Sequence, residues 1–307
     1  MTETSANHKS LALAVMLVSP LFFATNLVFG RAVVGSVAPF TLAFIRWLLV
    51  ASILLPALAG QRTVIAGVFS SHRRLVFLLG FLGMWLCGGV VYLGLENTTA
   101  TNATLIYATS PVFIILIEAM FAGRHIGWRE AVGSALALLG VGVIVLRGDL
   151  NALLSMSFNR GDLLILTAAI AWAGYSILYR SPGLSVLPNV ALLGVVAATG
   201  AILLLPFAVY EYLVGGAMPL TGHAWINISG IVIFSSLLAF STFQFGLREL
   251  GASLAGVFMY LLPAYGVLLA RIVLGEAMHA YHLTGIAMIM GGVILATLPP
   301  RYFARFR

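Results

Sequence analysis

Charged residues are scarce in this sequence. Asp, Glu, Lys and Arg make up 8% of the 307 residues, whereas 61% are hydrophobic. Ordinary soluble domains have about 25% charged residues, so this chain cannot cover a single core with a water-soluble surface. The composition predicts a membrane protein, and the length allows about ten spanning helices of roughly 20 residues each. We expect residues 1–307 to form a single membrane domain, all-α and polytopic, embedded in a lipid bilayer.

Cysteine and acidic side chains are also rare. Cys87 is the only cysteine, so the chain cannot form an internal disulfide. Nine acidic residues against sixteen Lys and Arg give a net charge of +7. Because the basic residues lie between apolar segments and at the chain ends, they indicate membrane topology and not a nucleic-acid partner.

Motifs of enzymes and of cofactor sites are missing as well. The sequence has no Gly-rich phosphate loop and no nucleophile elbow, so neither an enzyme nor a cofactor is expected. His279 and His282 have a spacing found in some metal sites, but a pair of ordinary loop residues is favoured over metal binding. The sequence does not decide the oligomeric state, and a monomer is compatible with it.

Apolar segments bounded by charged residues, Pro or Gly predict ten spanning helices. They cover roughly Leu11–Phe29, Ala38–Ala59, Leu75–Leu95, Thr99–Ala122, Ala131–Leu146, Leu163–Tyr179, Leu187–Tyr210, Trp225–Leu247, Ala252–Leu274 and Leu283–Leu298. Lys9 before the first segment imitates a signal peptide, but the apolar run is long enough to span, so we expect an uncleaved first helix.

The stretch 100–143 recurs 152 residues further along the chain without a gap. This register superposes residues that fix backbone geometry: Pro111 on Pro263, Gly123 on Gly275, Gly133 on Gly285 and Gly140 on Gly292. The first two segments match the sixth and seventh at a shift of 149 residues. We therefore predict two five-helix repeats, at about residues 11–147 and 162–299.

An odd number of spans in each repeat predicts that the second repeat is inverted in the membrane. If the N-terminus is cytoplasmic, most basic residues fall on the inner side: Lys9, Arg62, Arg73, Arg74, Arg124, Arg129, Arg180, Arg248, Arg301, Arg305 and Arg307. The outer side then holds Arg31, Arg147 and Arg160. This bias predicts that both termini are cytoplasmic.

Three short motifs resemble a known family. They are Phe22-Phe23-Ala24-Thr25-Asn26, then Pro39 followed by Leu42-Ala43-Phe44-Ile45-Arg46, and Pro263 ahead of Leu274-Gly275-Glu276. With the repeat, they resemble the EamA-type branch of the drug/metabolite transporter superfamily. The first repeat departs from the pattern, because Gly123-Arg124 stands where the motif has Gly-Glu.

The resemblance implies a ten-helix carrier of a bacterial-type inner membrane that exports amino acids, aromatic ones included, or similar small metabolites by alternating access. The alternative within transport is an exporter of cationic drugs or of another metabolite class. Outside transport, the alternative is a membrane enzyme or an assembly subunit.

Aromatic side chains near the middle of two spans are candidates for the substrate site. In the third segment Trp85, Gly88, Gly89 and Tyr92 share one helix face, where two aromatic rings flank a gap suited to a flat ligand. In the sixth segment Trp172, Tyr175 and Tyr179 repeat the spacing, and Tyr179 is also explained by an interfacial belt. Packing between helices is the alternative for all of them.

Polar side chains within the spans extend the predicted site. Asn102 and Tyr107 lie in the fourth segment, and Gln244 in the eighth is the repeat counterpart of Tyr92. Interhelical hydrogen bonding is the alternative role. We also expect Pro111 and Pro263 to kink the fourth and ninth helices, which could then bend alternately during transport.

Two ionisable residues carry open alternatives. Arg46 could bind a substrate carboxylate, but snorkelling or bonding to backbone carbonyls near the outer interface is favoured for it. Glu118 could be a proton site, and an interfacial ion pair with an arginine is an equal alternative.

Overall fold

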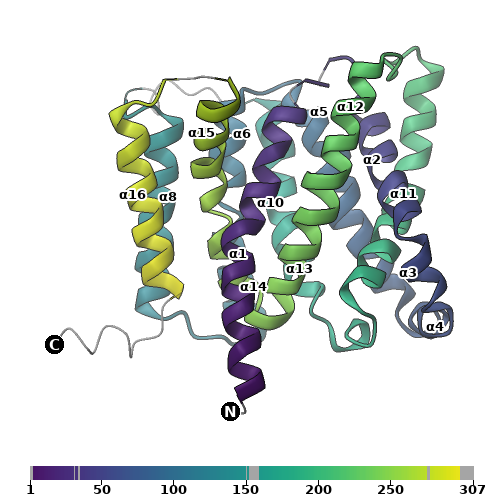
Figure 1. Cartoon of the computed structure of the whole chain (residues 1–307), viewed down its shortest axis with the longest axis horizontal. Coiled ribbons are helices and arrows are strands. Elements are labelled where there is room, and N and C mark those ends of the chain that lie inside the picture. Colours follow the sequence, from purple (N-terminus) through teal and green to yellow (C-terminus); the bar gives the residue numbers. More distant parts are fainter. Residues whose placement is uncertain are drawn as a thin grey trace.

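The computed structural model describes residues 3–30, 32–33, 35–149, 151, 159–274 and 277–297. Arg31, Gly275, Glu276, Arg301, Arg305 and Arg307, which the topology and motif predictions used, lie outside these residues. Within the described part the chain forms a bundle of upright helices (Figure 1), and its chain-order neighbours mostly run in opposite directions.

The first half contains the helices of five spans. They are α1 (Glu3–Phe29), α2 (Pro39–Ile53) with the short α3 (Leu55–Ala59), α4 (Arg62–Leu79) continued by the π-helix η1 (Gly80–Val90) and α5 (Val91–Leu95), α6 (Ala100–Tyr107) with α7 (Ser110–Ala122), and α8 (Trp128–Val145).

The second half repeats this order. It comprises α10 (Arg160–Leu178), the short 3-10 helix η2 (Pro182–Leu184), α11 (Asn189–Leu213), α12 (Gly222–Gly230) continued by the π-helix η3 (Ile231–Leu238) and α13 (Ala239–Leu250), α14 (Ala252–Phe258) with α15 (Leu261–Leu274), and α16 (Ala280–Thr297).

Nine helical runs among the described residues are long and apolar enough to cross a membrane, and Pro39–Ile53 is a shorter apolar helix. Each corresponds to one of the ten predicted segments, so the prediction of an all-α polytopic membrane protein is confirmed. Some helix ends differ from the prediction because capping residues extend them. The sixth span begins at Arg160 and not at Leu163, since Asn159 and Asp162 form a reciprocal capping box.

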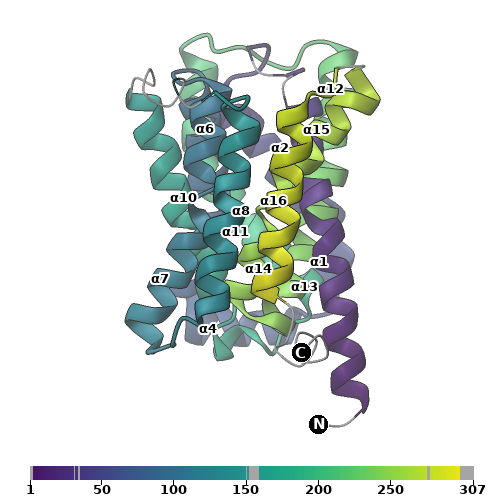
Figure 2. The same cartoon turned by 90° about the vertical axis from the view of Figure 1, so that its left-hand side faces the viewer.

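The helices α8 and α16 pack against each other through repeat-related glycines along one side of the bundle, at the left in Figure 1 and nearest the viewer in Figure 2. A Cβ atom on Gly133 would lie 2.6 Å from the carbonyl oxygen of Gly292, and one on Gly140 would lie 2.7 Å from that of Gly285. The two contacts are equivalent, because Gly133 corresponds to Gly285 in the other repeat and Gly140 corresponds to Gly292. A two-fold axis between inverted repeats requires this relation, and the missing side chains allow the backbones to touch.

The two repeats share their irregularities as well as their helices. The π-helices η1 and η3 overlap when the chain is shifted by the repeat distance, and so do the breaks between α6 and α7 and between α14 and α15. The prediction of proline kinks inside continuous helices needs correction. Pro111 and Pro263 lie in the first turn of α7 and α15, just after each break, where the missing N–H removes no helical hydrogen bond.

For the description below, the N-terminal face is the end of the bundle at which α1 begins, and the opposite face is the other end. The N-terminal face also carries the start of α4, the link from α7 to α8, and η2.

Candidate functional site

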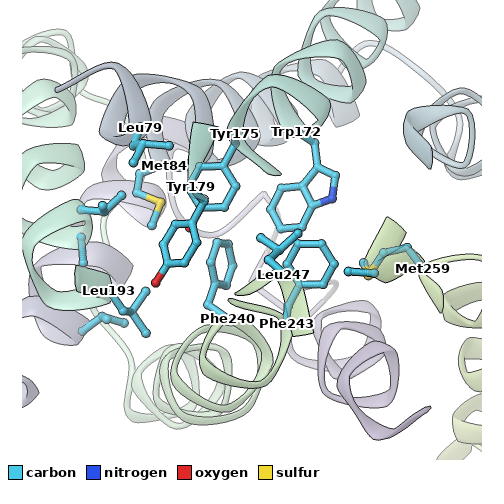
Figure 3. Packing of buried hydrophobic residues seen from close by; sticks show 14 of the residues in the cluster. Leu79, Met84, Trp172, Tyr175, Tyr179, Leu193, Phe240, Phe243, Leu247 and Met259 are labelled. Atoms are coloured by element: carbon cyan, nitrogen blue, oxygen red, sulfur yellow. The ribbon is translucent and has the colours of Figure 1, made fainter. Parts of the chain in front are cut away.

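Aromatic rings from several helices meet in the middle of the bundle. This central aromatic cluster consists of Phe23, Trp47, Trp172, Tyr175, Phe240 and Phe243. Figure 3 shows Trp172 and Tyr175 from α10 facing Phe240 and Phe243 from α13. The cluster therefore joins the two repeats, because α1 and α2 belong to the first and α10 and α13 to the second.

Phe240 contacts most of the cluster. Its ring centroid lies 4.9 Å from that of Trp47, 5.3 Å from Phe23 and 5.6 Å from Trp172. Trp172 in turn stacks on Phe243 at 5.0 Å and on Tyr175 at 5.5 Å. Such offset and edge-on contacts each contribute about 0.5–1.5 kcal/mol beyond area burial, so the cluster forms a cohesive layer across the bundle.

A hydrogen-bonded group lies on the N-terminal side of this layer. The side-chain amide of Gln244 donates to the Tyr175 hydroxyl at 2.6 Å, and its oxygen accepts from the Tyr179 hydroxyl at 3.0 Å. All three side chains are fully or almost fully buried. Arg248 lies over the Tyr179 ring at 5.5 Å. The structure thus brings together three of the predicted polar and aromatic residues.

A second polar group surrounds Arg46 on the other side of the layer. The guanidinium donates from Nε to the Ser236 hydroxyl at 2.6 Å, from NH1 to the Tyr92 hydroxyl at 3.2 Å, and from NH2 to the Ser235 carbonyl at 2.9 Å. Ser235 and Ser236 belong to η3, and π-helical segments often occur at functional sites. Along the helix from Ser236 to Gln244 the two polar groups are separated by roughly 12 Å.

Arg46 is a buried cation, with only 6% of its surface exposed. Among the described residues no carboxylate forms an ion pair with it. Its guanidinium has five N–H donors, and the three hydrogen bonds above leave two of them for another partner. The cation also lies 4.8 Å from the Trp47 ring centroid, a cation–π contact. The backbone-carbonyl bond expected for Arg46 is present, but its burial excludes snorkelling.

Two buried tryptophan donors also lack partners. The indole Nε1 atoms of Trp47 and Trp172 are buried and have no hydrogen-bond acceptor among the described residues. Buried polar groups are usually satisfied. Both atoms belong to the central aromatic cluster, so this layer combines two free donors with apolar ring faces, and the Arg46 cation lies beside it.

Trp85 lies apart from this cluster. Its half-buried ring packs against Phe40 at 5.6 Å, Phe81 at 5.1 Å and Phe207 at 5.1 Å. The gap predicted beside it is filled, because Phe40 occupies the space at Gly89 and Trp47 that at Gly88. In this structure the face that was predicted to hold a flat ligand packs on α2.

Asn102 and Tyr107 occupy two different places. The Asn102 amide donates to the Asp162 carboxylate at 3.2 Å near the opposite face, where Thr98 also hydrogen-bonds Asp162. This contact ties the start of α6 to that of α10. Tyr107 is half-buried against the core, and its electrostatic interaction with Arg46 places it on the Arg46 side of the central layer.

Glu118 lies in a polar network at the N-terminal face. Its carboxylate is 3.6 Å from Arg124 and 3.9 Å from Arg180, and it accepts a hydrogen bond from Ser253. Arg124 also pairs with Glu130 at 2.9 Å. Of the two alternatives given for Glu118, the ion pair with an arginine is present in the structure, and the network connects the two repeats at this face.

Sequence reasoning missed Phe23, Phe240 and Phe243 as site residues and ranked Arg46 low. Phe23 lies in the motif Phe22-Phe23-Ala24-Thr25-Asn26, and Phe240 and Phe243 share a helix face with Gln244. The motif and the shared helix face both pointed to these positions, but Phe is common throughout membrane-spanning helices and does not by itself indicate a binding site. Only the contacts across helices distinguish these rings from lipid-facing ones.

These features define a class: a bundle of inverted repeats with broken helices and a buried, partly polar centre is typical of secondary transporters. The chain belongs to the EamA-like transporter family, which matches residues 10–146 and again residues 159–298. The recognition of this family from the sequence is confirmed, and the chain is a membrane transporter and not an enzyme.

Several relatives cover most of the chain. An uncharacterized transporter, YetK of Bacillus subtilis, is 26% identical over 95% of this chain and 86% of its own length. A probable terminal-alkyne amino-acid exporter of Streptantibioticus cattleyicolor is 28% identical over 81% of this chain and 80% of its own. A solved crystal structure aligns with a TM-score of 0.77 and 22% identity, covering 96% of this chain and 99% of that one, which shows the shared fold.

Proposed function

We propose that this transporter exports amino acids, aromatic ones included, or similar small carboxylate-bearing metabolites. Arg46 carries the proposal, because it is a buried cation with free N–H donors and no carboxylate partner among the described residues. A substrate carboxylate supplies the missing anion through charge-assisted hydrogen bonds. The central aromatic cluster next to it supplies the apolar surface for the substrate side chain.

The site residues divide by their distance from Arg46. Tyr92 and Tyr107, which lie beside Arg46, help to hold the substrate carboxylate. Trp172 offers the substrate a ring face and a free Nε1–H. Tyr175 and Gln244 close the site toward the N-terminal face. Trp85 and Asn102, which pack elsewhere, support helices around it.

Export of cationic drugs fits this geometry less well. The buried carboxylates of Glu118 and Asp162 lie near the ends of the bundle and already have hydrogen-bonding partners. A cationic substrate would meet Arg46 as a like charge at the centre, which costs binding energy. The amino-acid exporter among the relatives supports the same choice.

In this proposal the carrier lies in a bacterial-type inner membrane with both termini in the cytoplasm, as the distribution of basic residues favours. The Glu118 network at the N-terminal face and the Asn102–Asp162 contact at the opposite face close the substrate site from one side at a time. The helix breaks before Pro111 and Pro263 are the points at which the helices bend as access alternates.

The direct test is flux of radiolabelled phenylalanine, tryptophan and leucine from proteoliposomes. We expect competition by other amino acids and no competition by phenethylamine and tryptamine, which lack the carboxylate. Arg46→Gln should lower kcat/KM about tenfold or more, since hydrogen bonds to a charged group contribute about 1.5–3 kcal/mol. Arg73→Gln, at an exposed arginine, is the matched control. Equal inhibition by amines and amino acids would contradict the assignment of Arg46.

A further inference from the structure

The helical run that contains α4 is too long for one span. It covers Arg62–Leu95, 34 residues, or roughly 50 Å of helix against about 30 Å of hydrocarbon. His72 breaks the helical geometry with φ −129° and ψ 22°. The break divides the run into a short helix, 62–71, and a span, 73–95. In Figure 1 the viewer looks nearly along the axis of the start of α4, below α3. This part of the helix therefore lies across the N-terminal face and not along the bundle.

The short helix 62–71 is amphipathic. Val64, Ile65, Val68 and Phe69 recur at helical spacing and are turned toward the protein, with Val68 buried and the others half-buried. The other positions are exposed: Arg62, Thr63, Ala66, Gly67, Ser70 and Ser71. Amphipathic helices are typical of the membrane interface, and here the apolar face packs against the bundle while the polar face is exposed.

An apolar groove of about 690 Å³ lies between this helix and its neighbours α3 and α11. Its walls come from α3, α4 and α11 and include Leu55, Arg62, Val195, Ala198, Thr199 and Ile202. Val195 and Thr199 are buried at its floor, whereas Leu55 and Ile202 are each 58% exposed. The groove therefore opens sideways, from the flank of the bundle that lipid would cover.

The polar groups of the groove are few and specific. Thr199 donates its hydroxyl to the carbonyls of Val195 and Val196 in its own helix, so it offers the groove no donor. Of the described residues that line the groove, Arg62 alone is charged. No ion pair involves it among the described residues, and the sequence 54–95 contains no Asp or Glu. An apolar groove with an uncompensated cation at the interface matches an amphiphilic anion.

We propose that this groove binds an anionic phospholipid, with an acyl chain along the apolar walls and the phosphate group paired with Arg62. The lateral opening, the interfacial helix and the positive charge of this segment, to which Arg73 and Arg74 add, all favour a membrane lipid over a water-soluble ligand. The site is distinct from the substrate site, because no residue of the central aromatic cluster lines the groove.

The first test is native mass spectrometry of the purified protein with 1-palmitoyl-2-oleoyl phosphatidylglycerol or the matching phosphatidylcholine. We expect Arg62→Gln to weaken phosphatidylglycerol binding about fivefold, the effect of one basic side chain near an anionic lipid, and to leave phosphatidylcholine binding unchanged. Arg160→Gln, an exposed arginine at the opposite face, is the matched control. Equal loss in both variants would show general surface attraction and overturn the proposal.

A second test addresses the groove itself. A phosphatidylglycerol that carries a photoreactive diazirine in its acyl chain should label peptides from 62–69 and 195–202, and Ala198→Trp should reduce this labelling by filling the groove. Arg62→Gln, at an exposed side chain, keeps the test valid if the tryptophan variant does not fold. Labelling confined to other helices in the wild type would overturn the proposal, and so would labelling unaffected by Arg62→Gln.

Discussion

At the scale of single residues, a few polar side chains are buried among apolar ones in the middle of the bundle. Arg46 and Gln244 both lie deep in the bundle, and each is held by hydroxyl groups from another helix. A buried polar group loses water on folding, so removing its partner costs more than the hydrogen bond itself contributes. A substitution at either position should therefore lower the free energy of unfolding as well as transport, so both quantities need to be measured.

The Tyr175–Gln244 pair gives the first prediction. Tyr175→Phe leaves the Gln244 amide without an acceptor for its 2.6 Å bond and should destabilise the protein by about 1–3 kcal/mol. The double variant Tyr175→Phe with Gln244→Leu removes both members of this pair. The Tyr179 hydroxyl, which then loses Gln244 as an acceptor, keeps Asn189 Oδ1 at 3.4 Å, so the double variant should recover part of that loss. Thermal unfolding in detergent measures both. Additive losses in the double variant would show that the hydrogen bond does not couple the two residues.

Trp172 and Trp85 give the second prediction, because the structure places them in different surroundings. In the flux assay, Trp172→Ala should change the selectivity among amino acids, since it removes a central ring and a free donor. Trp85→Ala should lower stability and leave selectivity unchanged. Single cysteines at the two positions in a Cys87→Ser background should show aqueous labelling at position 172 alone. The reverse pattern would place the substrate site beside Trp85, where it packs against Phe40 and Phe207.

At the scale of helices, close backbone packing and helix breaks decide how the repeats fit together. The α8–α16 contact depends on glycines that meet without side chains, while α6–α7 and α14–α15 are divided at equivalent points. These features are fixed by residue types that affect the backbone directly, namely Gly and Pro.

Gly140 and Gly142 provide a matched pair on one helix for the third prediction. A Cβ atom at Gly140 would lie 2.7 Å from the Gly285 carbonyl oxygen, whereas one at Gly142 would meet nothing within 4 Å. Gly140→Ala should therefore destabilise the protein by about 1–3 kcal/mol through overpacking. Gly142→Ala should be neutral or slightly stabilising because alanine favours the helix. Unfolding temperatures that fall equally would contradict the close contact of α8 and α16.

The proline positions give the fourth prediction. Pro111→Ala and Pro263→Ala restore a backbone N–H in the first turn after each helix break and allow the two pieces to join. Expression should stay close to that of the wild type, while the rate of transport should fall. Proteoliposome flux at equal protein density measures the effect. Wild-type flux in both variants would mean that the prolines shape the resting fold and are not needed for switching.

At the scale of the whole molecule, two inverted five-helix repeats surround one centre. Polar networks connect the repeats near both ends, through Glu118 with Ser253 and Arg180 at the N-terminal face and through Asn102 with Asp162 at the opposite face. An alternating-access carrier needs connections that break at one end while they hold at the other. Their placement fits such a cycle.

Membrane topology gives the fifth prediction. Reporter fusions after Arg74 and Arg124 should report the cytoplasm, and fusions near Arg160 and His223 should report the outer side, because basic residues gather on the cytoplasmic side. Alkaline phosphatase and green fluorescent protein fusions provide complementary signals. A cytoplasmic signal near Arg160 would contradict the inverted orientation of the repeats.

Much of the fold was predictable from the sequence, and the site only in part. The shift that superposes Pro111 on Pro263 and Gly133 on Gly285 reveals the repeat, because backbone geometry constrains these residues directly. Gln244, Tyr175 and Trp172 stand out as polar or aromatic residues deep in spans. Contacts such as that of Arg46 with Ser236 join residues 190 positions apart, and no local pattern encodes them.

The sequence by itself determined the membrane class, the ten spans, the repeat and the family, since each depends on composition, on length or on residues that set the backbone. Tertiary structure alone decided which side chains meet. It placed Trp85 against Phe40, buried Arg46 beside Trp47, and opened a lateral groove beside Arg62. The physical reason is that helix periodicity gives the direction of a side chain, whereas its neighbours depend on how whole helices pack.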